Sequence, residues 1–263
     1  MSQAVKDHAL EFLSNDEALE IEDSLWWVQG RKAIIRNYLK IALSDNFLFD
    51  SGINRMPKLM DVGCGSGGSF DVLSEFGSVL GVEPSSVLAN RARNRGIATS
   101  VFEKSVHDLE EVKEVNIFTL FDVLEHIEDD HSFMKGINDK ALQAHRVLVS
   151  VPACPALYSE HDRLLHHYRR YTKPMLRATL ENSGYEVELI SYHMSLLFPV
   201  AVAVRLLEKI KALLGKKSDT VEIGDAGPII SPILKSALTL ESHLVSKISL
   251  PIGLWLFALA RRK

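Results

Sequence analysis

The sequence predicts an α/β fold built around a parallel β-sheet. Short apolar runs of strand length alternate with longer amphipathic stretches of helical length over most of the 263 residues. A glycine cluster follows the first of these runs, and further Gly and Pro residues separate later segments. Strands that alternate with helices form parallel sheets with right-handed crossover connections. Because 46% of the residues are hydrophobic, the chain can bury one large core.

The N-terminal part of the chain is expected to be helical. Ser14–Asp16 can cap a helix that runs through Glu20, and apolar residues recur near one face over Ser24–Leu43. The pattern then changes to short apolar runs bounded by turn residues. These runs predict strands at Lys58–Val62, Ser78–Val82, Ala98–Phe102, Asn116–Phe121, Arg146–Val151, Tyr185–Ser191 and Leu250–Ala260.

The stretches between the strands predict helices. Gly96 and Gly184 each follow such a stretch, as glycine commonly does after a helix C-terminus, and Thr172 is a suitable N-cap. Gly215–Pro228 is rich in Gly and Asp and is expected to be a disordered linker. The expected helices are Ser69–Phe76, Ser85–Arg95, Asp130–Ala144, Lys173–Ser183, Ser195–Leu214 and Ser231–Lys247.

The composition excludes several classes of protein. A formal net charge of -4 is unlike the basic surface of a nucleic-acid binder, so no nucleic-acid partner is expected. Cys64 and Cys154 are too few for a disulfide scaffold. The polar, acidic N-terminus is unlike a signal peptide, and no apolar run reaches the roughly 18 residues of a spanning helix. A cytoplasmic enzyme is therefore expected.

The glycine cluster after the first strand, DVGCGSGG at 61–68, is the most informative segment. Its glycines let the backbone turn tightly and let a ligand approach the N–H groups. The spacing fits the dinucleotide fingerprint GxGxxG and also GxGxG, so the loop alone does not select the ligand. Asp61 would repel a pyrophosphate but suits an amino group, and Glu83 can accept hydrogen bonds from a ribose diol. The expected ligand therefore carries a nucleoside and a cationic part.

Three segments together resemble class I S-adenosylmethionine (SAM)-dependent methyltransferases. DVGCGSG (61–67) is similar to their first motif, GVEPS (81–85) to the acidic end of their second strand, and FDVLEHIED (121–129) to the segment after their fourth strand. The order and spacing match the family over about 26–191. The resemblance implies a doubly wound, Rossmann-like sheet of seven mostly parallel strands, the last antiparallel. It also implies a helical N-terminal cap and a helical insertion before the last strand.

The expected organisation is one domain over residues 1–263. A helical cap at 1–50 precedes a cofactor-binding half at 51–155. A substrate-side half at 156–263 holds the helical insertion at 195–247.

The resemblance also assigns cofactor contacts, with SAM as cofactor and S-adenosylhomocysteine as product. Asp61 and Gly63 would lie near the methionine amino group, and Glu83 would hold the ribose hydroxyls. WWVQGR (26–31) resembles an element whose helix covers the cofactor, with Arg31 near the cofactor carboxylate; core tryptophans and a surface arginine are the alternative. The full expected set is Trp27, Arg31, Asp61, Gly63, Cys64, Gly65, Gly67, Glu83, Pro84, Ser105, Val106, Phe121 and Asp122.

Two histidine-containing segments are candidates for catalysis. His126 follows the fourth strand, where its imidazole could act as a base near neutral pH or could simply hold its turn. HDRLLHHYRRY (161–171) resembles the HDxxxGHxRRY segment of a bacterial subgroup of these enzymes, with His166 in place of the glycine. The expected catalytic residues are His126, His161, Asp162 and His167, and the expected substrate contacts are Arg169, Arg170 and Tyr171.

A capping network into the Thr172 helix is the alternative for the 161–171 segment. No metal is expected, because His161, His166 and His167 lack a helical i, i+4 spacing and no cysteine or acid clearly completes the set.

The sequence leaves the acceptor open. The leading hypothesis is O- or N-methylation of a small-molecule or glycan- or lipid-linked acceptor. The segment 195–217 begins apolar and ends basic, which suits peripheral contact with the inner membrane surface but also suits a packed helix, a lid or a dimer interface. An NAD-dependent oxidoreductase and a non-catalytic cofactor-binding partner protein are the alternatives.

Overall fold

The computed structural model describes residues 23–43, 56–141, 145–203, 227–244 and 248–263. The predicted helix through Glu20, and the part of the predicted 195–214 helix beyond residue 203, lie outside these residues. The strands are β1 (Lys58–Val62), β2 (Ser78–Val82), β3 (Ser100–Phe102), β4 (Ile117–Phe121), β5 (Arg146–Pro152), β6 (Tyr185–His193) and β7 (Trp255–Arg262).

The α-helices and 3-10 turns lie between these strands. The α-helices are α3 (Trp26–Ala42), α5 (Phe70–Ser74), α6 (Ser86–Asn94), α7 (Asp130–Lys140), α8 (Glu160–Leu164), α9 (Lys173–Asn182) and α11 (Gly227–Leu244). The 3-10 turns are η1 (Val106–Asp108), η2 (Glu111–Glu114), η3 (Leu124–His126) and η4 (Pro155–Leu157).

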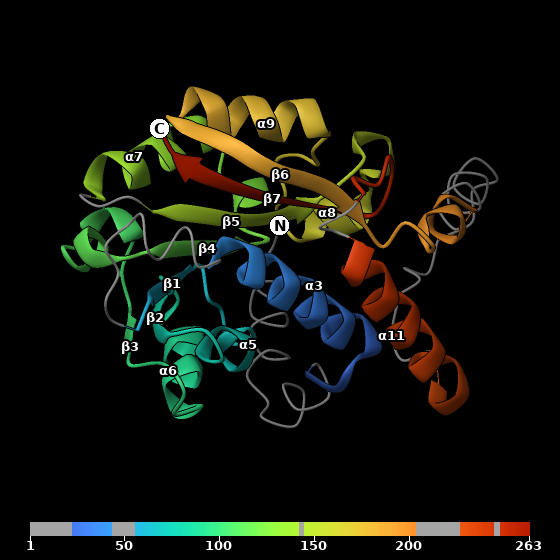
Figure 1. Ribbon diagram of the computed structural model, residues 1–263, viewed down its shortest axis with the longest axis horizontal. Coiled ribbons are helices and arrows are strands. Elements are labelled where there is room, and N and C mark those ends of the chain that lie inside the picture. The colour runs from blue at the N-terminus through green and yellow to red at the C-terminus, as the bar shows by residue number, and fades with distance from the viewer. Residues whose placement is uncertain (1–22, 44–55, 142–144, 204–226, 245–247) are drawn as a thin grey trace.

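The seven strands form one sheet in the order β3-β2-β1-β4-β5-β7-β6 (Figure 1). Neighbours from β3 to β5 are parallel, and β7 is inserted antiparallel between β5 and β6. The predicted doubly wound, mostly parallel seven-stranded fold with an antiparallel last strand is thus confirmed. Because the parallel strands point the same way, the loops after β1, β2, β4 and β5 meet at one edge of the sheet.

Helices cover both faces of the sheet. α3, α5 and α6 pack on one face with Ile35, Tyr38, Leu39 and Phe70 fully buried. α7, α9 and the 3-10 turns after β3 pack on the other face. This amphipathic pattern, with one apolar stripe for each helix, is the reason the sequence predicted helices here.

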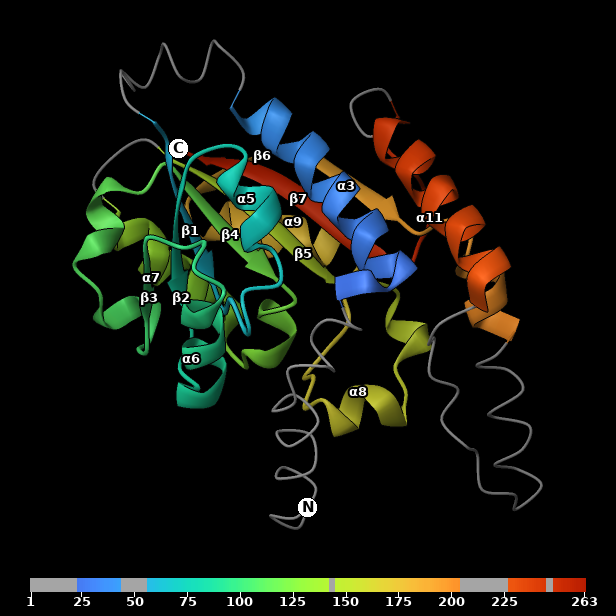
Figure 2. The same ribbon diagram turned by 90° about the horizontal axis from the view of Figure 1, so that it is seen from below.

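α11 lies beside α3 rather than on the sheet (Figure 2). The two helices approach closely at Gly30, where a Cβ atom would lie 2.5 Å from Leu238 Cδ1. Asn37 Nδ2 also donates to Ser242 Oγ at 2.9 Å. Gly30 therefore costs α3 some helix propensity but permits the crossing. Among the described residues, no helix combines the length and apolarity needed to cross a bilayer.

The structure corrects three predicted boundaries. α11 spans Gly227–Leu244, so the last two residues of the predicted linker are helical. β7 begins at Trp255 rather than Leu250, after a bend in which Gly253 lies against the backbone of His193. Between β5 and α9, where no helix was expected, lies α8, which a reciprocal Ser159–Asp162 capping box stabilises.

Candidate active site

The glycine loop after β1 is folded against β2. The N–H groups of Gly63 and Cys64 both donate to the Val82 carbonyl, at 2.8 and 3.1 Å. Gly63, Gly65 and Gly67 have φ values of 70°, 54° and 79°, a region that side chains disfavour. At Gly63 a Cβ atom would also lie 2.7 Å from Val123 Cγ2. The glycines of the predicted motif are thus required by backbone conformation and by close packing.

A cavity of about 260 Å³ lies between this loop and α3. Trp27 and Arg31 line it from α3, and Phe121 lines it from the end of β4. Asp61, Gly63, Cys64 and Gly65 also line it, so seven predicted cofactor residues surround one space. The lining residues that the sequence analysis did not select include Asp23, Lys32 and Leu88, which belong to no recognisable motif.

Asp61 is the buried acid of this cavity, with 3% of its surface exposed. Its Oδ1 accepts a hydrogen bond from Thr119 Oγ1 at 2.6 Å. Burial raises the pKa of Asp61 to about 7, against the opposing effects of Thr119 and Arg31. A carboxylate that is costly to ionise when alone gains most from a cationic ligand group.

Arg31 is held in place by acids and rings at the cavity wall. Its Nη1 lies 2.5 Å from Asp122 Oδ2, and its Nη2 donates to Ser150 Oγ at 3.0 Å. Trp255 Nε1 donates to the other oxygen of Asp122 at 3.2 Å, and the Trp255 ring stacks on Trp27. The buried Nε of Arg31 has no hydrogen-bond partner among the described residues. Arg31 therefore lines the cavity with a guanidinium group that Asp122 and Ser150 hold in place.

Glu83 stabilises the glycine loop and does not line the cavity. Its two carboxylate oxygens accept hydrogen bonds from the N–H groups of Gly65, at 3.0 Å, and Ser85, at 2.8 Å. Cys64 is buried beside it, and burial raises the pKa of its thiol, so a nucleophilic role is disfavoured.

Six predicted cofactor contacts do not line the cavity, namely Gly67, Glu83, Pro84, Ser105, Val106 and Asp122. Pro84 is exposed, Ser105 accepts a hydrogen bond from the backbone of His107, and Val106 is part of the core. Val106 lies outside because it is buried in the core at the start of η1.

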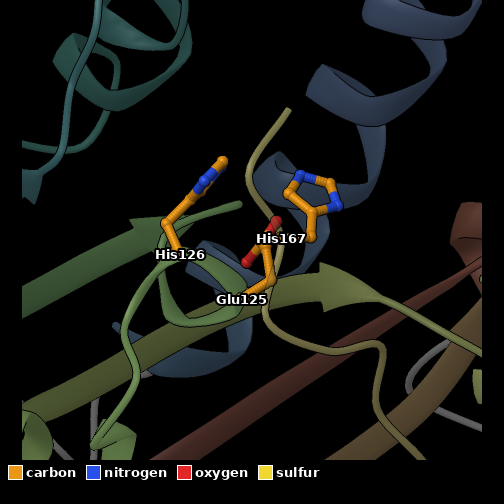
Figure 3. A group of neighbouring side chains, drawn as sticks. All are labelled: Glu125, His126 and His167. Atoms are coloured by element: carbon orange, nitrogen blue, oxygen red, sulfur yellow. The ribbon is translucent and has the colours of Figure 1, made fainter. Parts of the chain in front are cut away.

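The second predicted cluster, after β4 and β5, brings His126 and His167 together. Their ring centroids are 4.7 Å apart at an interplanar angle of 79°. Partial desolvation and the nearby His167 lower the pKa of His126. Glu125, which the sequence analysis did not select, lies between them in Figure 3 and is fully buried. Burial, and then the charge of Asp122, raise its pKa well above the usual value.

Asp162 holds the His167 imidazole in place. Its Oδ1 accepts hydrogen bonds from His167 Nδ1 at 3.0 Å and Arg170 Nε at 2.8 Å, and its Oδ2 accepts from the backbone of Ser159. Burial alone would raise its pKa, but the hydrogen bonds from His167 and Arg170 outweigh burial and hold the pKa below its ordinary value. Asp162 is therefore a positioning residue that has no surface of its own to offer a substrate.

The other predicted residues of the 161–171 segment are placed differently. His161 is exposed on α8, whereas the side-chain partners of Asp162 are His167, Arg170 and Ser159. Tyr171 was predicted to contact the substrate, but it is buried with its hydroxyl on Asp130 Oδ2 at 2.6 Å.

The two arginines are also used within the protein. Arg170 also donates to the Ala153 carbonyl, and Arg169 lies 3.4 Å from Asp130 Oδ1. Tyr171 is thus a core residue, while half-buried Arg169 keeps part of its surface exposed.

Comparisons with known proteins agree with this geometry. A sequence model of a family described as a methyltransferase domain matches residues 28–190, more than half of the chain. No curated protein matches the sequence.

Solved structures share the fold. A SAM-dependent methyltransferase from Thermotoga maritima, described as a possible histamine N-methyltransferase, has a TM-score of 0.53 at 13% identity. The match covers 90% of this chain and 93% of that one. A protein of Bacillus halodurans C-125 provisionally named a methyltransferase has a TM-score of 0.52 at 18% identity, over 82% and 96% of the two chains. The chain has the fold of class I SAM-dependent methyltransferases, and it belongs to the methyltransferase domain family.

Proposed function

We propose that this enzyme transfers the methyl group of SAM to a hydroxyl or amino group of a small molecule or of a glycan- or lipid-linked acceptor. The observation that carries the proposal is the cavity between α3 and the glycine loop. It offers a buried carboxylate, Asp61, for the cationic amino group of the cofactor and the guanidinium group of Arg31 for its carboxylate. The residues present therefore fit SAM on its methionine side.

SAM, when bound, supplies a methyl group already activated on a sulfonium, so the chain's own residues mainly orient the reactants and exclude water. Trp27 and Phe121 wall the cavity, and Trp255 stacks behind Trp27. The Asp122–Arg31 ion pair fixes the α3 cover to the end of β4. These contacts support a closed cofactor site under α3.

The acceptor side is supported by two surfaces. His126 is exposed and Arg169 partly exposed on the loops after β4 and β5, which suits a polar or anionic acceptor. Leu196 and Val200, and Ile233 and Leu240 on α11, are 60–68% exposed. Exposed apolar side chains on neighbouring segments suit a lipid-linked acceptor or contact with a membrane surface. Residues 204–217 of the predicted contact segment lie outside the described residues.

Calorimetric titration tests the cofactor. The full chain should bind SAM and S-adenosylhomocysteine, and Asp61→Asn should bind SAM more weakly. The control Asp139→Asn alters an exposed acid that is paired with Lys135 on α7, and it should bind like the wild type. Binding of NAD in place of SAM would favour the oxidoreductase alternative and contradict the proposal.

Turnover tests the acceptor. Transfer of labelled methyl from SAM would be measured with soluble phenols and amines, with soluble glycans, and with lipid-linked glycans in detergent micelles. Product with any of these classes supports the proposal and names the class. Cofactor binding without product across the whole panel would favour the non-catalytic alternative.

A further inference from the structure

Glu125, His126 and His167 form a group of possible metal ligands that the sequence did not predict. One ligand atom of each residue lies within 4.8 Å of those of the other two. Figure 3 shows the Glu125 carboxylate between the two imidazole rings. Glu125 and His126 come from η3, and His167 follows α8, so the fold brings them together from two loops at the same edge of the sheet.

The Glu125 carboxyl group is the observation that points to a ligand. Its side chain is fully buried, and no other described residue donates a hydrogen bond to either of its oxygens. Buried carboxyl groups are normally hydrogen-bonded, ion-paired or bound to a metal, because burying them alone is costly. Arg31 and Arg170 act on Glu125 only through space, and Asp122 adds a further negative charge nearby. The group thus combines one buried carboxyl group with two imidazoles.

The two imidazoles are oriented as metal ligands usually are. His167 donates through Nδ1 to Asp162 at 3.0 Å, which leaves the lone pair on Nε2. His126 forms a hydrogen bond with the backbone of Leu165. Metal-binding histidines commonly use their second nitrogen in this way, on a carboxylate or a backbone carbonyl. Asp162 is itself held by Arg170 and Ser159, so the orientation of His167 is fixed before any ion binds.

We propose that Glu125, His126 and His167 bind one divalent first-row transition-metal ion, such as Zn²⁺. Two imidazoles and one carboxylate suit this class of ion better than Ca²⁺ or Mg²⁺, which prefer oxygen ligands. Atoms at most 4.8 Å apart share a centre within about 2.8 Å of each, and a contraction of under 1 Å per ligand reaches the usual ~2.0–2.2 Å. Three protein ligands leave at least one position open.

The open position gives the ion a use in methyl transfer, and this use rests on the proposed function. An acceptor hydroxyl bound there would lose its proton to water more readily. Its oxygen would then form the bond to the methyl carbon as the carbon–sulfur bond breaks, which leaves a neutral thioether. The site thereby favours an oxygen acceptor over an amine.

Metal titration tests the site without any acceptor. The full chain, treated with a chelator and dialysed, would be titrated with Zn²⁺ by calorimetry and with Co²⁺ by visible absorption. One ion per chain is expected, and Glu125→Gln and His167→Gln should each weaken binding by about 100-fold or more. Asp162→Asn, which leaves the three ligands in place, should weaken it by roughly 10- to 100-fold.

His166→Asn is the matched control, because His166 is the exposed neighbour of His167 and asparagine tolerates its φ of 59°. It should bind Zn²⁺ like the wild type. Thermal unfolding keeps the test independent of folding defects, since Zn²⁺ should raise the Tm of the wild type and of His166→Asn but not that of Glu125→Gln.

Failure of the wild type to bind either ion, or wild-type affinity in Glu125→Gln, would overturn the metal site. Neither result would bear on SAM binding, and loss of SAM binding would not affect the titration with Zn²⁺.

Discussion

Replacing Asp61 with asparagine should change the pH dependence of stability in a calculable way. In the folded chain without ligand, burial raises the pKa of Asp61 from 3.8 to about 7. Because the folded-state pKa is the higher one, the folded state holds the proton between these values while the unfolded state releases it. The wild type therefore loses stability as pH rises from about 4 to 7 and remains at the lower level above pH 7.

The magnitude follows from the two pKa values. The full difference corresponds to about 4 kcal/mol, and about 2.5 kcal/mol of it develops between pH 5 and pH 8. Asparagine carries no charge at either pH, and its carbonyl can still accept the hydrogen bond from Thr119. The amide can also change stability by an amount that does not depend on pH. Beyond that amount, the free energy of unfolding of Asp61→Asn should rise by about 2.5 kcal/mol relative to that of the wild type between pH 5 and pH 8.

Urea unfolding followed by circular dichroism at pH 5, 6, 7 and 8 measures the free energy of unfolding of both proteins. The quantity compared is the value for Asp61→Asn minus the value for the wild type. Asp139→Asn is the control, because its carboxylate is exposed on α7, and its gap to the wild type should stay small across the range. If the free energy of unfolding of Asp61→Asn minus that of the wild type stays constant or decreases from pH 5 to pH 8, the assignment of a costly buried carboxyl at this position is refuted. In the wild type, SAM affinity should also fall about tenfold from pH 8 to pH 6, as the carboxylate is protonated.

Three further predictions concern the packing around the site. Gly63→Ala should lower the free energy of unfolding by about 1–3 kcal/mol, because Gly63 has a φ of 70° and a Cβ atom there would meet Val123. At Gly65 a Cβ atom would meet no atom within 4 Å, so Gly65→Ala should lower it less. Thermal unfolding of the two variants compares these effects. Tyr171→Phe should cost about 1–3 kcal/mol, because Asp130 loses a buried donor, and equal stability of the two proteins in urea would contradict this. Iodoacetamide should label half-buried Cys154 before buried Cys64 in the native chain, because the Cys64 thiol is less accessible. Mass spectrometry of a time course measures the order of labelling. Earlier labelling of Cys64 would indicate that the glycine loop opens readily.

Local patterns predicted most of the sheet. β1 and β2 have the predicted bounds, and α3 lies within the predicted Ser24–Leu43. Central strands of a parallel sheet are buried on both faces, so they appear in the sequence as apolar runs with clear ends. The bend at Gly253 was not predicted, because it depends on close approach to His193 in another strand.

The site was only partly predictable, for the same reason. Asp61 and the glycine loop could be found, because a single turn fixes their geometry. The stacking of Trp27 on Trp255 joins residues far apart in the sequence, and no local pattern indicates it. Glu125 belongs to the quoted FDVLEHIED segment, but only the packed structure shows that its carboxyl is buried without a partner. The Ser159–Asp162 capping box was a readable local signal for α8 that the sequence analysis did not use.

The position of β7 has a consequence for how the protein is made. Among the described strands, β6 pairs only with β7, and β7 follows the other six in the chain. Until β7 has been synthesised, β6 cannot pair with the sheet, and the edge of the sheet at β5 stays unpaired. Unpaired backbone groups at such an edge can form hydrogen bonds with other chains. Trp255 lies at the start of β7 and completes the wall around Asp122 and Trp27. This support for Trp27 and Asp122 therefore forms only when β7 enters the sheet, so nascent chains are expected to acquire SAM binding late.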